Sequence, residues 1–304
     1  MKVKLNLDYY SGQDLYSDGP IEDELLDIAK RYTEEEYNQV IAMKNDWSVL
    51  YHFSHIRQNV VSWLPITPND SVLEIGSGCG AITGALADMA KDVTCIELSH
   101  KRSQINAYRN YNKDNIEIMV GNFETIEPNL EKKYDYITLI GVFEYAEGYI
   151  GGKEPYKNFL QIIKKHLKPD GKIVLAIENR WGLKYWAGCR EDHSGKFFDG
   201  INGYPDTNGV KTFTKQELCT IADVCDLNYE FYYPYPDYKL PMVVYSDAYL
   251  PKKGELNSNI NNLDRDRYIM FDENKVFDDI IEQNMFPQYS NSFLVLLSLG
   301  EKKC

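Results

Sequence analysis

The chain has 304 residues, of which 43% are hydrophobic, and a formal net charge of −13. This length and apolar content allow one large folded domain with additions, and the acidic balance disfavours nucleic acid as a partner because phosphate contacts need a basic face. We expect no membrane span and no signal peptide, since no apolar run is long enough and the start of the chain soon becomes acidic. Six cysteines without metal-type spacing indicate reduced thiols and a cytoplasmic location.

Residues 1–64 are predicted to be mostly helical and to form a lid over a ligand site. One helix is expected to open at Thr33, whose hydroxyl precedes three glutamates and is suited to N-capping. A second helix is expected from Trp47 to Leu64, with apolar residues spaced along one face. Tyr51 and Arg57 of this helix are candidate ligand contacts. Core packing is the alternative role for Tyr51.

An apolar strand that runs into alternating glycines is the most informative motif of the chain. Residues 71–80 are Ser-Val-Leu-Glu-Ile-Gly-Ser-Gly-Cys-Gly. Glycines let the backbone turn sharply and approach a ligand closely, and a helix expected over 81–89 has free N–H groups at its start. The candidate ligand-binding residues of this motif are Glu74, Gly76, Ser77, Gly78 and Gly80.

This glycine loop alone leaves two classes of nucleotide open. Gly76-x-Gly78-x-x-Ala81 satisfies the dinucleotide fingerprint, whose helix N-terminus favours a pyrophosphate. The carboxylate of Glu74 would repel a pyrophosphate and suits a cationic ligand. S-adenosylmethionine fits this charge because it carries a sulfonium and an ammonium group and no phosphate. A purely structural role, with Glu74 capping a tight turn, is the alternative.

The next predicted strand, over residues 92–97, ends in a carboxylate. Glu97 is then placed at the edge of the sheet, where an acidic side chain is suited to bind both ribose hydroxyls. Leu98 follows it directly and is included as a candidate cofactor contact.

Two further predicted strands lead to residues suited to a nucleoside base. The strand over 116–120 is followed by Asn122, which is suited to read an adenine amino group, and by Phe123, which is suited to pack on the base. The strand over 134–140 is followed by Gly141, which permits a close approach. All three are therefore candidate cofactor residues.

The apolar strands indicate the fold class. A fifth strand follows a turn at 167–171 and ends at Glu178. Nearly continuous apolar strands are typical of a parallel sheet that is covered on both faces. The predicted fold is therefore α/β, with a Rossmann-like sheet, helices on both faces, and insertions after the fifth strand and before the last strand. The expected parts are an N-terminal helical lid at 1–64 and a core at 65–304, which contains a substrate-loop insertion at about 179–211 and a cap at about 245–286.

In this order the motifs resemble those of the class I S-adenosylmethionine-dependent methyltransferases. The resemblance covers about residues 60–183 and rests on Glu74-x-Gly76-x-Gly78-x-Gly80, Glu97, Gly121-Asn122, the Gly141 strand and Leu167-Lys-Pro-x-Gly171. It implies a class I methyltransferase fold, S-adenosylmethionine as the cofactor, and methyl transfer as the activity. The chain departs from the family at Asn122, where Asp is commoner, and at Glu144-Tyr145, where many relatives have His.

Two segments are predicted to contact a substrate. The segment from Glu178 to Tyr204 is rich in polar residues, aromatics and glycines, and it follows the end of a strand, where open α/β folds bind ligands. The segment 231–241 combines tyrosines, prolines and a lysine; aromatic faces edged with hydroxyls suit a sugar or a heterocycle, and rigid packing is the alternative. The candidate substrate residues are Glu144, Tyr145, Glu178, Asn179, Arg180, Tyr204, Tyr235, Tyr238 and Lys239.

A finer resemblance bears on the acceptor. The stretches Glu178-Asn-Arg-x-Gly-Leu-Lys-Tyr, Glu191-Asp-His193 and Pro236-Asp-Tyr-Lys-Leu-Pro241 together resemble a bacterial methyltransferase subfamily associated with polysaccharide and glycan biosynthesis. This resemblance implies a saccharide or a related small molecule as the acceptor.

A sugar hydroxyl is a weak nucleophile and benefits from a general base. His193 is the candidate because the ordinary pKa of histidine lies near neutral pH, and Glu191 or Asp192 is placed to orient it. The alternative is that His193 only forms a hydrogen bond within its loop. Glu191, Asp192 and Glu178 are also suited to hold a divalent cation, but we assign no metal from the sequence.

Three classes of function stay open. The first is O-methylation of a saccharide or a related small molecule. The second is a non-catalytic scaffold that binds S-adenosylmethionine, which the intact glycine loop disfavours. The third is methylation of a macromolecule, either protein or nucleic acid; the acidic charge and the absence of an Asn/Asp-Pro-Pro-aromatic tetrad disfavour nucleic acid. The sequence does not indicate the oligomeric state.

Overall fold

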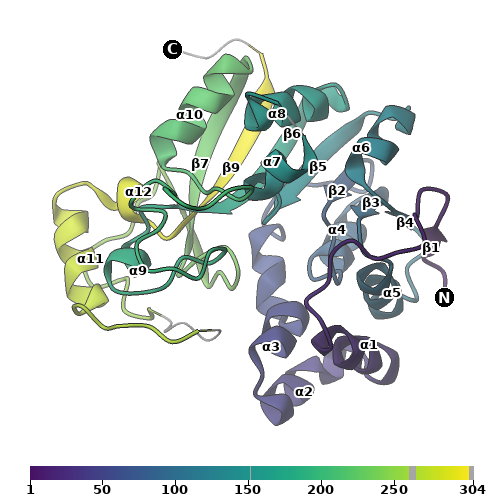
Figure 1. Ribbon diagram of the computed structural model, residues 1–304, viewed down its shortest axis with the longest axis horizontal. Helices are drawn as coiled ribbons and strands as arrows, with labels where there is room; N and C mark the ends of the chain where they lie inside the picture. Colours follow the sequence, from purple (N-terminus) through teal and green to yellow (C-terminus); the bar gives the residue numbers. More distant parts are fainter. Residues whose placement is uncertain (151, 260–264, 301–304) are drawn as a thin grey trace. The chain divides into compact units, whose positions relative to one another are not determined.

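The computed structural model describes residues 1–150, 152–259 and 265–300. The chain divides into two compact units, each built from two segments of the sequence. Unit 1 consists of Met1–Leu139 and Lys165–Ile173, and unit 2 consists of Ile140–Lys164 and Val174–Cys304. Figure 1 labels their helices and strands, and the units are described one at a time.

Unit 1 begins with a short strand and a group of helices and continues as alternating strands and helices. Its strands are β1 (Lys4–Asn6), β2 (Ser71–Ile75), β3 (Asp92–Glu97), β4 (Ile116–Val120) and β5 (Tyr134–Ile140), the last of which ends in unit 2. Its α-helices are α1 (Ile21–Arg31), α2 (Tyr37–Lys44), α3 (Trp47–Phe53), α4 (Thr83–Met89), α5 (His100–Arg109) and α6 (Phe123–Ile126). Its 3₁₀ turns are η1 (Glu34–Glu36), η2 (His55–Val60) and η3 (Glu127–Asn129).

The strands of unit 1 form a parallel sheet in the order β1-β4-β3-β2-β5. Every residue of β2 is buried, as expected for a strand inside a parallel sheet with both faces covered. Helices α4, α5 and α6 pack on the sheet (Figure 1). The carboxyl ends of β2, β3 and β4 therefore lie along the same edge, which is where the glycine loop, Glu97 and Asn122 follow them.

The N-terminal region differs from the predicted lid in two details. The helix expected from Trp47 to Leu64 is wrong as one continuous element, because Ser54 is extended (φ −64°, ψ 128°) and its hydroxyl accepts from the N–H of Ile56 at 3.3 Å. This local hydrogen bond competes with the helical one and starts the separate turn η2. Strand β1 was not predicted, because three residues are too few to show a period. Thr33 is the N-cap residue, as predicted, but of the 3₁₀ turn η1, with a capping box to Glu36, and the α-helix α2 begins only at Tyr37.

Helices α1, α2 and α3 are not an independent layer. Leu25, Val40 and Phe53 from these helices form one buried cluster with Cys79 of the glycine loop and Ile105 of α5. The helices are therefore anchored to the part of unit 1 that carries the loop.

Unit 2 contains the remaining elements. Its strands are β6 (Leu167–Glu178), which begins in unit 1, and β7 (Leu227–Tyr235), β8 (Val243–Ser246) and β9 (Ser292–Leu299). Its helices are η4 (Phe143–Tyr145), α7 (Ala146–Tyr149), α8 (Pro155–Lys164), α9 (Leu183–Trp186), α10 (Lys215–Val224), α11 (Glu273–Glu282) and α12 (Phe286–Tyr289).

The sheet of unit 2 has the order β6-β9-β7-β8, and β7 runs antiparallel to both neighbours. Residues 231–241 were predicted to contact a substrate, and the first part of that segment belongs to β7. Phe231, Tyr233 and Tyr235 are each at most 5% exposed, so the period of two that marks a strand was present in the aromatic residues. Helix α10 begins at Thr214 with a capping box to Glu217.

Among the described residues, no helix is long and apolar enough to cross a membrane. Five cysteines of the described part are free thiols, and Cys304 lies outside the described residues.

Candidate functional site

The glycine loop of unit 1 has a left-handed backbone at alternate residues. The φ angles of Gly76, Gly78 and Gly80 are 70°, 52° and 76°, a region that favours glycine. A Cβ atom at Gly80 would also lie 2.4 Å from Oδ1 of Asn106 on α5. Gly80 is thus required both for its conformation and for the close packing of helix α5 against the loop.

Glu97, at the end of β3, holds the glycine loop in place. Its carboxylate accepts the N–H of Gly78 at 2.7 Å and the N–H of Ser99 at 2.9 Å. Burial raises the pKa of Glu97, while these backbone donors and Arg102 act in the opposite direction. The carboxylate therefore lies against the loop that the sequence assigned to the cofactor, and its bond to ribose stays a prediction.

Glu74 of β2 points into the interior of unit 1. Its Oε2 atom accepts the hydroxyl of Thr83 at 2.6 Å and the thiol of Cys95 at 3.4 Å, and the amide of Asn106 donates to the same hydroxyl at 3.0 Å. Burial raises the pKa of Glu74 to about 7. Its charge at neutral pH is therefore only partial. The predicted attraction of a cationic ligand stays a prediction.

The other residues of unit 1 that were predicted to contact the cofactor are Tyr51, Arg57, Ser77, Leu98, Asn122 and Phe123. The side chain of Asn122 caps α6 by accepting the N–H of Glu124 at 3.1 Å, and Phe123 is buried. The guanidinium of Arg57 lies 4.2 Å from the ring centre of Tyr51. Ser77 is buried in the loop. Leu98 follows Glu97 directly.

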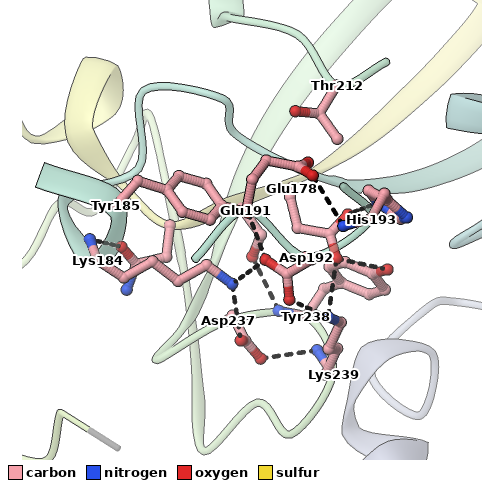
Figure 2. A network of polar contacts seen from close by, with 12 residues as sticks. Glu178, Lys184, Tyr185, Glu191, Asp192, His193, Thr212, Asp237, Tyr238 and Lys239 are labelled. Carbon is pink, nitrogen blue, oxygen red and sulfur yellow. Dashed lines mark hydrogen bonds and ion pairs between the residues drawn. The ribbon is translucent and has the colours of Figure 1, made fainter. Parts of the chain in front are cut away.

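Unit 2 contains a second group of buried polar side chains, which we call the charged centre. It consists of Glu144, Glu178, Lys184, Asp192, His193, Asp237 and Lys239. Figure 2 shows most of these side chains converging from the end of β6, helix α9, the loop after α9 and the segment after β7. These segments are far apart in sequence, so only the fold brings them together.

Glu178, the last residue of β6, contacts both His193 and Lys239 of the charged centre. Its Oε1 atom accepts the hydroxyl of Tyr238 at 3.2 Å and lies 3.1 Å from Nζ of Lys239. Its Oε2 atom lies 3.4 Å from Nε2 of His193. Burial opposes ionisation, but Lys239 and His193 lower the pKa of Glu178 to about 2. Glu178 is therefore an anion held between two cationic groups (Figure 2).

His193 lies between two carboxyl groups. Its Nε2 atom is 3.9 Å from Oε1 of Glu144, and its Nδ1 atom is 3.1 Å from the hydroxyl of Tyr145. Burial lowers the pKa of His193, but Glu178 and then Glu144 outweigh that effect and raise it to about 9. Most of the ring is thus protonated at neutral pH, and only the unprotonated fraction can act as the predicted general base.

Glu144 follows β5 on η4 and is 1% exposed. Its Oε2 atom is buried and has no hydrogen-bond partner among the residues that the structure describes. Burial and the neighbouring charge of Glu178 raise the pKa of Glu144. A buried acceptor that lacks a partner is costly, so this oxygen is a natural point for an incoming group.

The two predicted companions of His193 have different tasks. Oε2 of Glu191 accepts the N–H of His193 at 2.8 Å and of Ser194 at 2.6 Å, so Glu191 fixes the backbone turn rather than the ring. Asp192 turns the other way and binds Lys184 at 2.9 Å and Lys239. Catalytic roles for both stay predictions.

Two of the predicted substrate residues, Asn179 and Arg180, bind other segments of unit 2. Nδ2 of Asn179 donates to the carbonyls of Gln288 and Ser290, both at 2.8 Å, and Arg180 binds Glu217 at 2.8 Å. Their substrate contacts stay predictions.

Of the remaining predicted residues, Tyr204 and Tyr235 are buried in unit 2, and Gly141 is partly exposed. The hydroxyl of Tyr204 donates to Glu191 at 3.2 Å, and that of Tyr235 accepts the N–H of Ser258 at 3.0 Å. A Cβ atom at Gly141 would lie 2.9 Å from the hydroxyl of Tyr238. Gly141 therefore gives room to the residue that holds Glu178.

Sequence reasoning missed Lys184, Tyr185 and Asp237 as members of this network. Lys184 lies 3.7 Å from Asp237, and the hydroxyl of Tyr185 donates to Asp192. Lys184 is 9% exposed. A lysine next to a tyrosine on a short helix carries no sign of burial, so the sequence held no signal for this pairing.

Comparisons with known proteins bear on the fold and the cofactor. Residues 73–173 match the family model described as a methyltransferase domain. The chain is 28% identical over 126 residues to a tRNA (guanine-N(7)-)-methyltransferase of Mycoplasma mobile, which covers 40% of this chain and 63% of the relative. It is 24% identical over 265 residues to ribosomal RNA small subunit methyltransferase A of Borrelia garinii subsp. bavariensis, covering 82% of each.

One solved structure that the chain matches is phosphoethanolamine N-methyltransferase 1 of Haemonchus contortus in complex with phosphoethanolamine and S-adenosylhomocysteine. The match has a TM-score of 0.48 and 15% identity, and it covers 94% of this chain and 51% of the other.

The match over residues 73–173 identifies a methyltransferase domain in this part of the chain, with S-adenosylmethionine as its cofactor, and the sheet order confirms the predicted Rossmann-like α/β fold. The chain spans less than two thirds of the length of the transfer-RNA enzyme that it matches. The activity and acceptor of the whole chain are therefore proposals.

Proposed function

We propose that the chain transfers the methyl group of S-adenosylmethionine to a hydroxyl group of a saccharide or a related small molecule. The observation that carries the acceptor proposal is the position of His193, which lies between the carboxyl groups of Glu144 and Glu178 in unit 2. A polar acceptor needs hydrogen-bonding groups of this kind, and its hydroxyl needs help to lose a proton.

The cofactor side of the proposal rests on unit 1. The glycine loop after β2 and the carboxylate of Glu97 at the end of β3 lie together through the bond from Gly78. S-adenosylmethionine carries an activated methyl group, so the protein mainly has to bind and align the two reactants. Methyl transfer breaks the bond between sulfur and the methyl carbon and forms a bond from the acceptor oxygen to that carbon; the electron pair stays on sulfur and the acceptor loses its proton.

A macromolecular acceptor is the second candidate. It is favoured by the relatives named for methylating transfer RNA and ribosomal RNA, the latter matching over most of its length. The net charge of −13 argues against it because RNA binding needs a basic face. An acceptor screen separates the two candidates.

The cofactor is tested by calorimetry on the purified chain. We expect S-adenosylmethionine to bind and NAD not to bind. Glu97→Ala should weaken S-adenosylmethionine binding by about 1–3 kcal/mol, the scale of a lost hydrogen bond to a charged group. Binding of NAD without S-adenosylmethionine would refute the proposal.

The acceptor is tested by transfer of a radiolabelled methyl group to saccharides, nucleotide sugars, transfer RNA and ribosomal RNA fragments. We expect label in a saccharide or related small molecule. For that acceptor, His193→Ala should lower the rate by roughly 10²–10⁴-fold, the usual share of a general base, with unchanged affinity for S-adenosylmethionine. Label in RNA alone would favour the second candidate, and tight cofactor binding with no turnover on any acceptor would favour a scaffold.

A further inference from the structure

Three side chains of the charged centre present potential metal ligands to one another. One ligand atom each from Glu144, Glu178 and His193 lies within 4.8 Å of the other two. One carboxylate comes from η4, which follows β5, the other comes from the end of β6, and the imidazole comes from the loop after α9. Two oxygens and one nitrogen are a donor set that suits Mn²⁺ and Zn²⁺ better than Ca²⁺.

In Glu178 and His193, the polar atom that is not offered as a metal ligand already contacts another residue. Oε1 of Glu178 is bound by Tyr238 and Lys239, which leaves Oε2 toward His193. Nδ1 of His193 faces the hydroxyl of Tyr145, which leaves Nε2 toward both carboxylates. Metal ligands are typically oriented in this way by a second layer of hydrogen bonds.

The third side chain supplies an independent indication of a ligand. Oε2 of Glu144 is buried without a hydrogen-bond partner among the described residues, although the side chain is 1% exposed. Neighbouring ligand atoms of an ion with bonds of about 2.1 Å lie roughly 3.0–3.4 Å apart. The 3.4 Å between Nε2 of His193 and Oε2 of Glu178 matches this spacing, and the 3.9 Å between Nε2 of His193 and Oε1 of Glu144 is longer than it.

The charges of the surrounding side chains leave room for a divalent cation. Lys184 and Lys239 are balanced by Asp192 and Asp237, through contacts of Lys184 at 2.9 and 3.7 Å and a contact of Lys239 with Asp192. A divalent ion that binds here displaces any proton on Glu144 and His193, which leaves the two carboxylate charges that it neutralises.

From this geometry we propose that Glu144, Glu178 and His193 bind one divalent transition-metal ion. Three protein ligands leave positions open, as in catalytic metal sites, and an oxygen of the acceptor fits such a position. The inferred role rests on the proposed function, but the metal site itself does not. A nitrogen that coordinates a metal cannot accept a proton, so in the metal-loaded chain Nε2 of His193 is a ligand, and the bound ion replaces it as the group that helps the acceptor hydroxyl to lose its proton by lowering the pKa of that hydroxyl.

The test is a titration of the full chain, freed of metal with a chelator, with Mn²⁺ followed by calorimetry and electron paramagnetic resonance. We expect one Mn²⁺ per chain and a nitrogen coupling in the pulsed spectrum from the His193 ring. Glu144→Gln and His193→Gln should each weaken Mn²⁺ binding at least tenfold, and His193→Gln should abolish the nitrogen coupling. Asp237→Asn is the matched control, since it removes a charge of the same centre without removing a ligand, and should bind within about threefold of the unaltered chain.

Circular dichroism and S-adenosylmethionine binding verify that each variant is folded. Failure of the folded chain to bind Mn²⁺ or Zn²⁺ at about 1 mM would overturn the proposal, as would unchanged binding in Glu144→Gln and His193→Gln. Methyl transfer by metal-free protein, with no gain on adding Mn²⁺, would overturn the role in acceptor binding and leave the proposed methyltransferase function intact.

Discussion

Glu74 in unit 1 and Glu178 in unit 2 are both strand carboxyl groups with at most 2% exposure, yet their ionisation differs in direction. Burial raises the pKa of Glu74 to about 7, whereas Lys239 and His193 overcome burial and lower the pKa of Glu178 to about 2. The difference lies in the partners. Glu74 has a hydroxyl and a thiol, and Glu178 has a lysine and a histidine.

The two carboxyl groups differ in what compensates the cost of burying their charge. Neutral donors satisfy the hydrogen-bonding needs of a carboxylate but compensate little of the cost of removing its charge from water. Cations compensate that cost and create a network that is damaged when one member is removed. Glu74 therefore titrates near neutral pH, whereas Glu178 stays ionised among its cationic partners.

Removing a cation from the charged centre should have the largest effect on stability. Lys239→Met leaves Glu178 and Asp192 with one cationic partner fewer in a buried setting, and we expect a loss of about 3–5 kcal/mol in the free energy of unfolding. Urea denaturation measures this loss. Lys275→Met is the control, because the side chain of Lys275 is 84% exposed and lies 3.7 Å from Asp272. If both variants lose less than about 1 kcal/mol, the array does not stabilise unit 2.

The pH dependence of unit 1 should reveal the raised pKa of Glu74. Its folded-state pKa of about 7 exceeds the ordinary 4.5, so its contribution to stability is complete below pH 4.5 and is lost as the pH rises through 7. The shift corresponds to about 3 kcal/mol. We expect the stability of the unaltered chain relative to Glu74→Gln to fall by this amount between pH 4 and pH 8, in urea unfolding without cofactor. A difference that stays constant over this range would contradict the raised pKa.

The sequence predicted the local elements of both units better than their contacts. Strands β2 to β6 follow from apolar runs, and the N-cap at Thr33 follows from the glutamates after it, because these signals lie within a few residues of the element. The break at Ser54 depends on one side-chain hydrogen bond, which periodicity does not record. The buried face of β7 consists of aromatic residues at every second position. These residues were interpreted as substrate contacts, so their alternation was not recognised as that of a strand.

The residues of the candidate site also differ in whether the local sequence predicts their position. The glycine loop and Glu97 are encoded by residues close to strand ends, so the sequence could place them. The pairing of Lys184 with Asp192 and Asp237 depends on how separate segments of unit 2 fold together, and no local pattern specifies it. The same holds for Glu144 and His193, whose separate roles were considered without their proximity.

A smaller change should show how far hydrogen bonds alone support Glu74. Thr83→Val keeps the shape of the side chain but removes the hydroxyl that donates to Glu74 at 2.6 Å and accepts from Asn106 at 3.0 Å. We expect a loss of about 1–3 kcal/mol, because the buried amide of Asn106 and the buried carboxyl of Glu74 each lose a hydrogen bond, and only the weaker thiol donor of Cys95 stays on Glu74. Thr83→Ser retains the hydroxyl and is the matched control, with an expected loss below about 1.5 kcal/mol. The loss in Thr83→Val should be larger at pH 8 than at pH 5, since the ionised carboxylate needs the donor more than the protonated acid does. Equal and pH-independent losses in the two variants would mean that the hydroxyl contributes packing alone and that burial by itself sets the ionisation of Glu74.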